Sequence, residues 1–362
     1  MYKKLIALGF TLGFIILACS LIYIWNAKRI TPLKPSELES YCVNMAYSSN
    51  NHCSTIKNNE TAQEVLHNWT NLIKDMGFKG VGLAELECYY WDDYLTTYLD
   101  YLNESGLKVA VYIMWRDFTI NFTFGEPNAI PSDVWKPQDF PDNSTKCEAW
   151  ISFVDNITEI TKNYDNIQFY LLFMPFRWWD WEGKWYEANF SNQSGYKYWM
   201  QEVVNTIKAN DDKPVILVSD GIEIENSSLI PYLPYGLKNI DGYGFTYYSR
   251  TFDDFCESKF NEMVSLYQKN LKDYLDGKGF LWLAEWGYQI TNEYGYGRCS
   301  SESRKAQLIY ETLEAIMKYQ IKYFGYFAIQ DFPSEKADFG LAYYDFTLKP
   351  SGLLMKTILK EE

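Results

Sequence analysis

The clearest candidate for chemistry in this sequence is a carboxylate that stands directly after a short apolar run. Glu285 follows residues 280–284, and Gly279 and Gly287 bound this stretch. The run is too short for a helix and too uniformly apolar for a strand with one face in water, so it predicts a strand buried on both faces. A charged group at the end of such a strand is costly unless it is used there. A Glu turned outward to water is the alternative interpretation.

Other polar and aromatic residues follow the remaining apolar runs in the same way. They are Glu85, Trp115, Asp117, Arg177, Asp220, Tyr248, Gln330 and Asp331. Further aromatic rings and one more carboxylate stand beside them, namely Trp178, Trp179, Trp286 and Glu182. Two carboxyl groups that face each other supply a nucleophile or base together with an acid, so this set predicts acid–base or nucleophilic catalysis.

The elements that would position these residues alternate between short apolar runs and amphipathic segments. The expected strands are 42–47, 79–84, 107–114, 167–174, 214–218, 240–246, 280–284 and 323–329. The expected helices are 61–76, 92–105, 147–164, 195–209, 253–275, 302–319 and 349 onward, while Pro231 and Pro234 weaken the helix between the fifth and sixth strands. Eight such units predict an α/β fold, a single (β/α)8 TIM barrel, whose strand ends meet at one mouth.

Composition narrows the possible partners. The chain has 362 residues, of which 47% are hydrophobic and 18% aromatic, with 31 Tyr and 13 Trp. Tyr and Trp suit stacking on sugar rings, although they also suit a stable core. The net charge of −14 argues against a nucleic-acid partner. Only two His are present, which disfavours a His-based triad or a His-rich metal site. We expect no cofactor and no metal, although a carboxylate-bound Ca²⁺ would leave no recognisable signature.

The N-terminal segment 1–29 predicts a membrane anchor. Residues 5–25 are uncharged and lie between basic pairs, Lys3-Lys4 and Lys28-Arg29. The run is long enough to cross the hydrocarbon core, which favours a retained signal anchor over a cleaved signal peptide. Lipidation of Cys19 is a weaker alternative. Residues 30–40 are expected to be a tether, and residues 41–362 the barrel.

Sequons and cysteines indicate that the barrel lies outside the cell. The nine N-x-S/T sequons are Asn59, Asn68, Asn103, Asn121, Asn143, Asn156, Asn189, Asn192 and Asn226, where about three are expected by chance. Six cysteines follow the anchor without metal-site spacing, so we expect disulfides, with Cys42–Cys53, Cys88–Cys147 and Cys256–Cys299 as the pairs. The sequence thus predicts a single-pass protein of the cell membrane, secreted if the segment is cleaved. It does not predict an oligomeric state.

Three motifs resemble those of the clan of retaining (β/α)8 glycoside hydrolases that includes cellulases, β-mannanases and β-galactosidases. They are Ala-Glu-Trp-Gly at 284–287, the segment 240–248, and the segment 325–332 with its continuation at 339–341 and 349–350. The resemblance implies that Glu285 is the nucleophile and that Tyr248 holds it.

One departure from this clan concerns the acid. The clan has Asn-Glu-Pro at the end of strand four, where this sequence has Phe173, Met174 and Pro175. Met174 cannot transfer a proton, so we expect Glu182 to be the acid/base, with Glu85 and Asp117 as rivals. The strand-eight Trp of the clan is also replaced, by Phe327 or Ala328.

The resemblance implies an extracellular glycoside hydrolase that cleaves O-glycosidic bonds of an oligo- or polysaccharide. The residues expected to contact sugar are Glu85, Trp115, Asp117, Arg177, Trp178, Trp179, Asp220, Tyr248, Trp286, Gln330 and Asp331. Structural roles stay open for some of them: loop packing for the Trp residues, a helix cap for Asp220, and an ion pair with Arg177 for Asp331. A carbohydrate-binding pseudoenzyme, a surface-layer or adhesion module, and another barrel hydrolase are the alternatives.

Overall fold

The computed structural model describes residues 31–45, 59–84, 94–120, 132–175, 177–179, 185–219, 236–249, 251–290, 297–331, 338–343 and 345–361. Residues Leu33–Glu362 form one compact unit, and Met1–Pro32 are assigned to another. The expected membrane segment, residues 5–25, lies outside the described residues. Of the helices that are described, none combines the length and the apolar character needed to span a bilayer.

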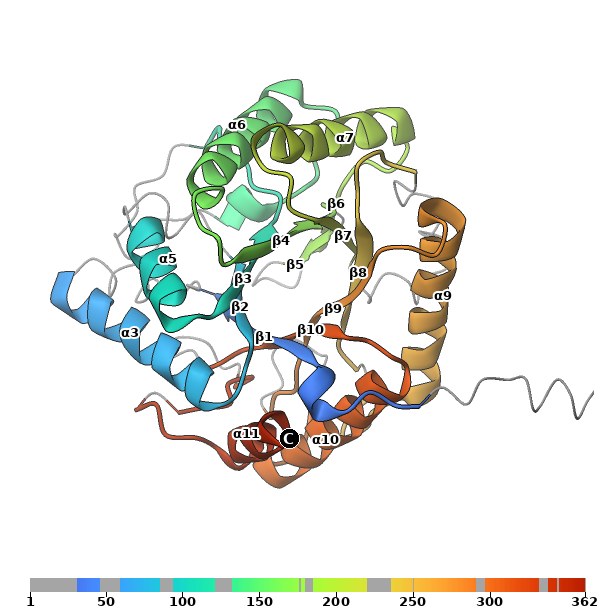
Figure 1. Cartoon of the computed structure of the whole chain (residues 1–362). Coiled ribbons are helices and arrows are strands. Elements are labelled where there is room, and N and C mark those ends of the chain that lie inside the picture. The colour runs from blue at the N-terminus through green and yellow to red at the C-terminus, as the bar shows by residue number, and fades with distance from the viewer. Residues whose placement is uncertain are drawn as a thin grey trace, which may run out of the picture. The chain divides into compact units, whose positions relative to one another are not determined.

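Eight parallel strands close into a barrel, which confirms the expected fold (Figure 1). In chain order they are β1 (Glu39–Met45), β2 (Gly80–Ala84), β3 (Lys108–Ile113), β4 (Ile167–Phe173), β7 (Val215–Ser219), β8 (Gly242–Tyr247), β9 (Phe280–Trp286) and β10 (Tyr323–Phe327). Around the barrel the order is β1-β10-β9-β8-β7-β4-β3-β2. Each strand pairs with its chain neighbours, and β1 closes the ring by pairing with both β2 and β10.

Helices follow the strands and surround the barrel (Figure 1). They are α3 (Asn59–Asp75), α5 (Tyr94–Ser105), α6 (Ser144–Thr161), α7 (Gln193–Asn210), α9 (Glu257–Leu275), α10 (Glu302–Lys318) and α11 (Pro350–Lys360). Short 3-10 turns, η1 (Pro35–Glu37) and η2 (Ser132–Trp135), add to them. After β4 the chain also forms an antiparallel hairpin, β5 (Arg177–Trp179) with β6 (Trp185–Glu187), which the sequence pattern did not predict.

Strand residues alternate between two buried layers. Along β3, Ala110 and Tyr112 lie in the cluster inside the barrel, whereas Val109, Val111 and Ile113 lie in the larger cluster between barrel and helices. This is the period of two that a strand buried on both faces requires. The inner cluster is rich in large rings, contributed by Tyr41, Tyr112, Phe169 and Trp282.

Part of the expected tether, residues 30–40, belongs to the barrel unit. The Leu33 N–H donates to the carbonyl of Met317 at 3.1 Å, and β1 begins at Glu39 rather than after residue 41. The side chain of Glu39 also forms an ion pair with Lys108 of β3 at 2.6 Å. The described residues from Leu33 onward are therefore tied into the barrel unit.

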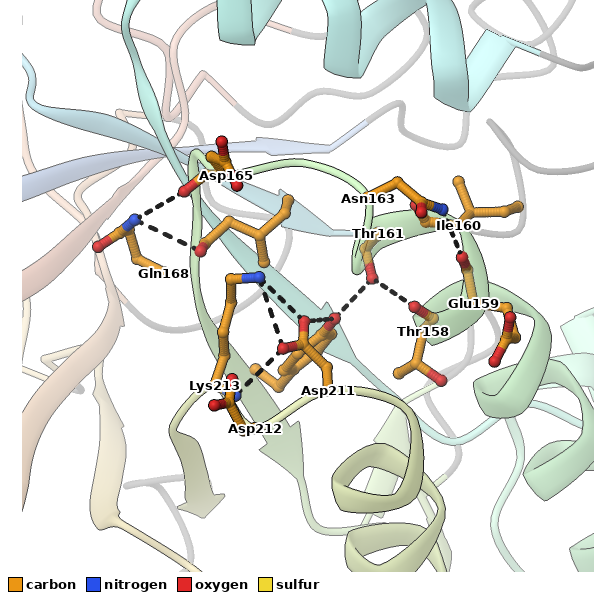
Figure 2. A network of polar contacts seen from close by, with 12 residues as sticks. Thr158, Glu159, Ile160, Thr161, Asn163, Asp165, Gln168, Asp211, Asp212 and Lys213 are labelled. Atoms are coloured by element: carbon orange, nitrogen blue, oxygen red, sulfur yellow. Dashed lines mark hydrogen bonds and ion pairs between the residues drawn. The ribbon is translucent and has the colours of Figure 1, made fainter.

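A polar network joins the ends of α6 and α7 to β4 (Figure 2). The hydroxyl of Tyr170 donates to Asp211 at 2.9 Å and lies 2.7 Å from the hydroxyl of Thr161. Asp211 also forms an ion pair with Lys213 at 3.2 Å. Because Asp211 and Tyr170 are buried, this network satisfies polar groups that would otherwise destabilise the fold.

The three expected disulfides are wrong, since each pair includes a cysteine that is a free thiol. Cys42, Cys147, Cys256 and Cys299 are the cysteines that the structure describes, and all four are free thiols. Cys299 donates instead to the carbonyl of Gln289 at 3.3 Å, and Cys256 contacts Ser258 at 3.5 Å. Backbone hydrogen bonds, such as Asp253 N–H to Arg298 O at 2.9 Å, join the two loops that the Cys256–Cys299 bond was expected to connect. Cys53 and Cys88, the expected partners of Cys42 and Cys147, lie outside the described residues.

Candidate active site

Strand β9 carries a bulge immediately before Glu285. Against β8, Leu283 pairs with Phe245 and Glu285 pairs with Thr246, so Ala284 is an extra residue. The pairing with β10 shifts at the same place, because Leu283 pairs with Phe324 and Trp286 with Tyr326. A bulge changes the face to which the following side chains point, and bulges are common next to active sites. Here the bulge places Glu285 on the same side as Ala284, which lies inside the barrel.

Glu285 meets Tyr248 at the carboxyl ends of their strands. The Tyr248 hydroxyl donates to Oε2 of Glu285 at 3.4 Å, which confirms the expected hydrogen-bond reach between them. The ring of Tyr248 lies edge-on to Phe339 at 5.8 Å and to Phe327 at 6.5 Å. A partly buried carboxylate therefore stands beside a phenol and two apolar rings at this end of the barrel.

Gly287 and Gly297 have specific packing roles next to this pair. A Cβ atom on Gly287 would lie 2.2 Å from the carbonyl oxygen of Phe327. Gly297 has φ +63, and a Cβ atom there would lie 2.8 Å from the carbonyl oxygen of Gly287. Only glycine allows the segments after β9 and β10 to approach this closely. Steric crowding therefore explains why the Ala-Glu-Trp-Gly motif ends in glycine at position 287.

Trp286 does not lie beside Glu285 in the barrel mouth, which corrects the sequence-based expectation. Its side chain is 1% exposed, and its ring packs edge-on against Tyr326 at 4.9 Å. Trp286 belongs to the layer between the barrel and the helices. The physical reason is strand alternation, which directs the residue after Glu285 to the opposite face.

Trp115 and Asp117, at the end of β3, are also buried within the protein rather than presented to a ligand. The ring of Trp115 packs edge-on against Phe140 and Trp150, at 5.0 and 5.3 Å. Asp117 is 1% exposed and forms an ion pair with Lys146 at 2.6 Å. Its other oxygen accepts hydrogen bonds from Thr119. These contacts give both residues a structural role, and Asp117 is no longer a strong rival for the acid.

Gln330 and Asp331 also have protein partners. Gln330 accepts from the indole of Trp69 in α3 at 3.0 Å and donates to the Tyr343 carbonyl at 2.9 Å. Asp331 forms an ion pair with Lys349 at 2.6 Å. The side chain of Arg177, the expected alternative partner, lies outside the described part of the structure. Burial raises the pKa of Asp331, and the nearby Lys349 opposes this rise. Both residues fix the segment after β10 to the surrounding helices.

The described residues at the end of β4, 173–175, include no carboxylate. Phe173 packs against the cluster inside the barrel, and its ring lies 5.2 Å from that of Tyr112. Met174 is 8% exposed and packs in the outer layer. The residue that faces the barrel interior here is therefore Phe173, and Met174, which we matched to the Glu of the clan, faces away.

The remaining expected site residues lie in or beside segments outside the described part of the structure. Glu85, Glu182 and Asp220 lie outside the described residues. For Arg177, Trp178 and Trp179 the structure describes the backbone, which forms β5, and not the side chains. In the described part of the chain, no group of three or more His, Cys, Asp or Glu side chains could hold a metal ion.

Tyr112 was not among the predicted site residues, and Phe327 was noted only as a replacement for the strand-eight Trp of the clan. The hydroxyl of Tyr112 in β3 donates to the carbonyl of Ala284 at 2.5 Å. Phe327, at the end of β10, packs against the inner cluster and the ring of Phe339 at 5.3 Å. Both residues lie in largely apolar strands, so the sequence pattern did not distinguish them from ordinary core residues. The one available signal was glycine at alternate positions of 80–82, which leaves room for large rings inside the barrel.

No protein-family model and no curated protein matches this sequence. Solved structures match its fold. The GH5_18 structure from Bifidobacterium longum subsp. longum matches with TM-score 0.62 and 12% identity, over 89% of this chain and 78% of that one. The GH5_18 structure from Streptomyces cattleya in complex with GlcNAc gives TM-score 0.60 and 11% identity, over 89% and 80%. A GH113 β-1,4-mannanase matches with TM-score 0.55 and 11% identity, over 91% of this chain and 100% of that one. The chain therefore shares the (β/α)8 barrel of these glycoside hydrolases.

Proposed function

We propose that this chain is a retaining glycoside hydrolase that cleaves O-glycosidic bonds of an oligo- or polysaccharide. The single observation that carries the proposal is the contact between Tyr248 and Glu285 at the carboxyl ends of adjacent strands. Catalytic residues of TIM-barrel enzymes stand at that end of the barrel. The barrel shared with the GH5_18 and GH113 structures supports the same reaction class.

In the proposed reaction, a carboxylate oxygen of Glu285 attacks the anomeric carbon of the sugar. The bond to the leaving oxygen breaks while a second carboxyl group donates its proton to that oxygen. Water then hydrolyses the glycosyl ester, giving its proton to the second group and releasing Glu285. The Tyr248 hydrogen bond orients Glu285 and favours its ionised form, which is the form that attacks.

The second carboxyl group is proposed to be Glu182, with Glu85 as its rival. A retaining pair needs carboxyl groups about 5–5.5 Å apart. Asp117 is the weaker candidate because its ion pair with Lys146 engages it.

The test uses the full-length protein in detergent on a panel of aryl glycosides and polysaccharides. β-Mannosides and N-acetylglucosaminides come first, because a mannanase and a GlcNAc complex are among the matching structures. Glu285→Gln keeps the shape of the side chain and removes its nucleophile. We expect turnover by the natural chain and its loss in this variant. Equal turnover by both would refute the role of Glu285.

We further propose that residues 5–25 anchor the protein in the cell membrane with the barrel outside. The uncharged run and the nine sequons support this arrangement. Protease added to intact cells should then release a large glycosylated fragment. A barrel that stays protected until lysis would contradict it.

A second candidate is a sugar-binding protein without turnover. The specific observation in its favour is that Phe173 and Met174 stand where the clan has its acid, and neither can donate a proton. Calorimetric titration of the Glu285→Gln variant and the natural chain with the same sugars separates the two candidates. Binding to both with no hydrolysis by either would favour the second.

A further inference from the structure

Tyr112 spans the interior of the barrel from one strand to the opposite one. Its strand β3 and the strand β9 are separated by three strands in either direction around the ring. The side chain is 1% exposed and belongs to the inner cluster, and its hydroxyl donates to the carbonyl of Ala284 at 2.5 Å. A single side chain therefore connects two opposite walls, directly below the end that carries Glu285.

Two glycines make this span possible. A Cβ atom on Gly82 of β2 would lie 2.9 Å from the Tyr112 ring. A Cβ atom on Gly325 of β10 would lie 2.6 Å from its hydroxyl and 2.4 Å from the Ala284 carbonyl oxygen. Any larger residue at either position would force the ring or the bulge to move. Glycine at positions 82 and 325 thus leaves room for the Tyr112 side chain next to β2 and β10.

The bonded carbonyl belongs to the bulge residue. Ala284 is the extra residue in the pairing of β9 with β8, and the pairing with β10 shifts between Leu283 and Trp286, so the Ala284 peptide departs from the regular ladder. A buried backbone carbonyl needs a donor, and the Tyr112 hydroxyl supplies one. The peptide that this bond fixes is the one that leads into Glu285.

The protonation state of Tyr112 is suited to this role. Burial, followed by the negative charge of Glu285, holds the pKa of the phenol well above its ordinary value. The hydroxyl therefore remains a donor throughout the pH range in which the ionised Glu285 would act.

We infer that Tyr112 is a positioning residue, which sets the direction of Glu285 by holding the bulge at Ala284. The inference rests on the proposed function, since it assigns Tyr112 a part in presenting the nucleophile. Tyr112 acts through the Ala284 peptide and not by contact with the reacting atoms.

The test compares Tyr112→Phe with Tyr170→Phe. Both are buried strand tyrosines with a bonded hydroxyl, but Tyr170 lies in the outer layer and bonds Asp211. For Tyr112→Phe we expect kcat to fall about 10–100-fold while KM changes less than about threefold, because a misdirected group affects the transition state more than ground-state binding. For Tyr170→Phe we expect a lower Tm with kcat unchanged. Equal kcat in Tyr112→Phe and the natural chain would overturn the inference.

A second variant and a second readout guard against misfolding and against absence of activity. Gly82→Ala crowds the Tyr112 ring while keeping every hydrogen-bonding atom, and it should also lower kcat selectively. The NMR signal of glutamate labelled with 13C at its carboxyl carbon reports on Glu285 without any substrate. The Glu285 signal is identified as the one that is lost in Glu285→Gln. The midpoint of this signal in a pH titration should move upward in Tyr112→Phe, since the Ala284 carbonyl then lacks its donor beside the carboxylate.

These readouts separate the two possible failures. If no sugar is hydrolysed by the natural chain, the proposed function fails, and the carboxyl signal alone decides the positioning role. A Glu285 signal that titrates identically in Tyr112→Phe and Tyr170→Phe would overturn that role. A signal shifted only in Tyr112→Phe supports it even without turnover.

Discussion

The hydroxyl of Tyr248 lies 3.4 Å from Oε2 of Glu285, across the ends of two adjacent strands. This contact depends on the bulge at Ala284, which brings Glu285 opposite Thr246 rather than one position further along β8. Tyr248 in turn packs against Phe339 and Phe327. The direction of the carboxylate is therefore determined by β8, β9 and the segment after β10 together.

Removing the Tyr248 hydroxyl should impair Glu285 without unfolding the barrel. For Tyr248→Phe we expect kcat/KM to fall about 10²-fold, similar to the loss of one preorganised donor in other sites. The acid limb of the pH–rate profile should move to higher pH, because a hydrogen bond to the carboxylate favours its ionised form. The measurement is kcat/KM as a function of pH.

The neighbouring Tyr247 provides the matched control. Its hydroxyl donates to the carbonyl of Cys256 at 3.2 Å, in the outer layer. Tyr247→Phe should leave the pH–rate profile in place. If the two variants behave alike, the Tyr248–Glu285 contact has no catalytic role.

Alkaline pH should destabilise the protein through its buried tyrosines. Burial raises the pKa of Tyr243 to about 12 and holds those of Tyr112, Tyr288 and Tyr326 well above their ordinary value. An unfolded tyrosine ionises near pH 10. Above about pH 10 the unfolded chain therefore releases protons that the folded chain retains, and the free energy of unfolding falls as pH rises. Urea titrations at several alkaline pH values measure this slope, and a flat profile above pH 10 would contradict the prediction.

The thiols of the described cysteines should differ in reactivity. Cys42, Cys147 and Cys299 are buried, and burial raises the pKa of Cys147 and Cys299 to about 12. Cys256 is partly exposed. Since the thiolate is the reactive form, iodoacetamide should modify Cys256 in the native protein and the other three only after unfolding. Peptide mass spectrometry locates the modified residues, and a disulfide-linked Cys256–Cys299 peptide before reduction would refute the free-thiol assignment.

The ion pair between Asp331 and Lys349 allows a test of whether Asp331 has a structural role or contacts sugar. Asp331 binds Lys349 at 2.6 Å and accepts from the Gly340 N–H at 3.0 Å, and the Lys349 side chain is 3% exposed. Asp331→Asn would leave a buried lysine without its main counter-charge, so we expect a loss of about 3 kcal/mol in the free energy of unfolding. We expect KM to stay unchanged, as measured at a temperature where the variant is folded. A large rise in KM with unchanged stability would instead restore Asp331 as a sugar contact.

The sequence predicted the barrel because its strands are short apolar runs separated by glycine, proline and amphipathic segments. The run after Gly279, for example, became β9. The contact of Tyr248 with Glu285 was expected from the resemblance of the segments around them to two motifs of the glycoside hydrolase clan. The sequence could not predict the bulge at Ala284, which depends on pairing with both neighbours and on a hydroxyl from the opposite wall. For the same reason the sequence placed Trp286 in the mouth, although alternation after the bulge sends it outward.

The end of β4 provides the last prediction, which concerns restoring an acid. Met174 is buried in the outer layer, whereas Phe173 packs on the inner cluster, 5.2 Å from Tyr112. In Met174→Glu the new carboxyl group would lack both water and a counter-charge, so the variant should be destabilised by several kcal/mol. It should gain no activity toward sugars with poor leaving groups, for which protonation of the leaving oxygen matters most.

Phe173→Glu is the paired variant, and it should direct its carboxyl group toward the barrel interior. We expect it to retain a higher Tm than Met174→Glu, because Phe173 is partly exposed and borders the mouth. If the natural chain binds sugars without hydrolysing them, Phe173→Glu is the variant expected to acquire turnover. The measurement is the hydrolysis of aryl glycosides with leaving groups of graded acidity. A gain of turnover in Met174→Glu instead would mean that residue 174 faces the site and that the orientation of β4 described above is wrong.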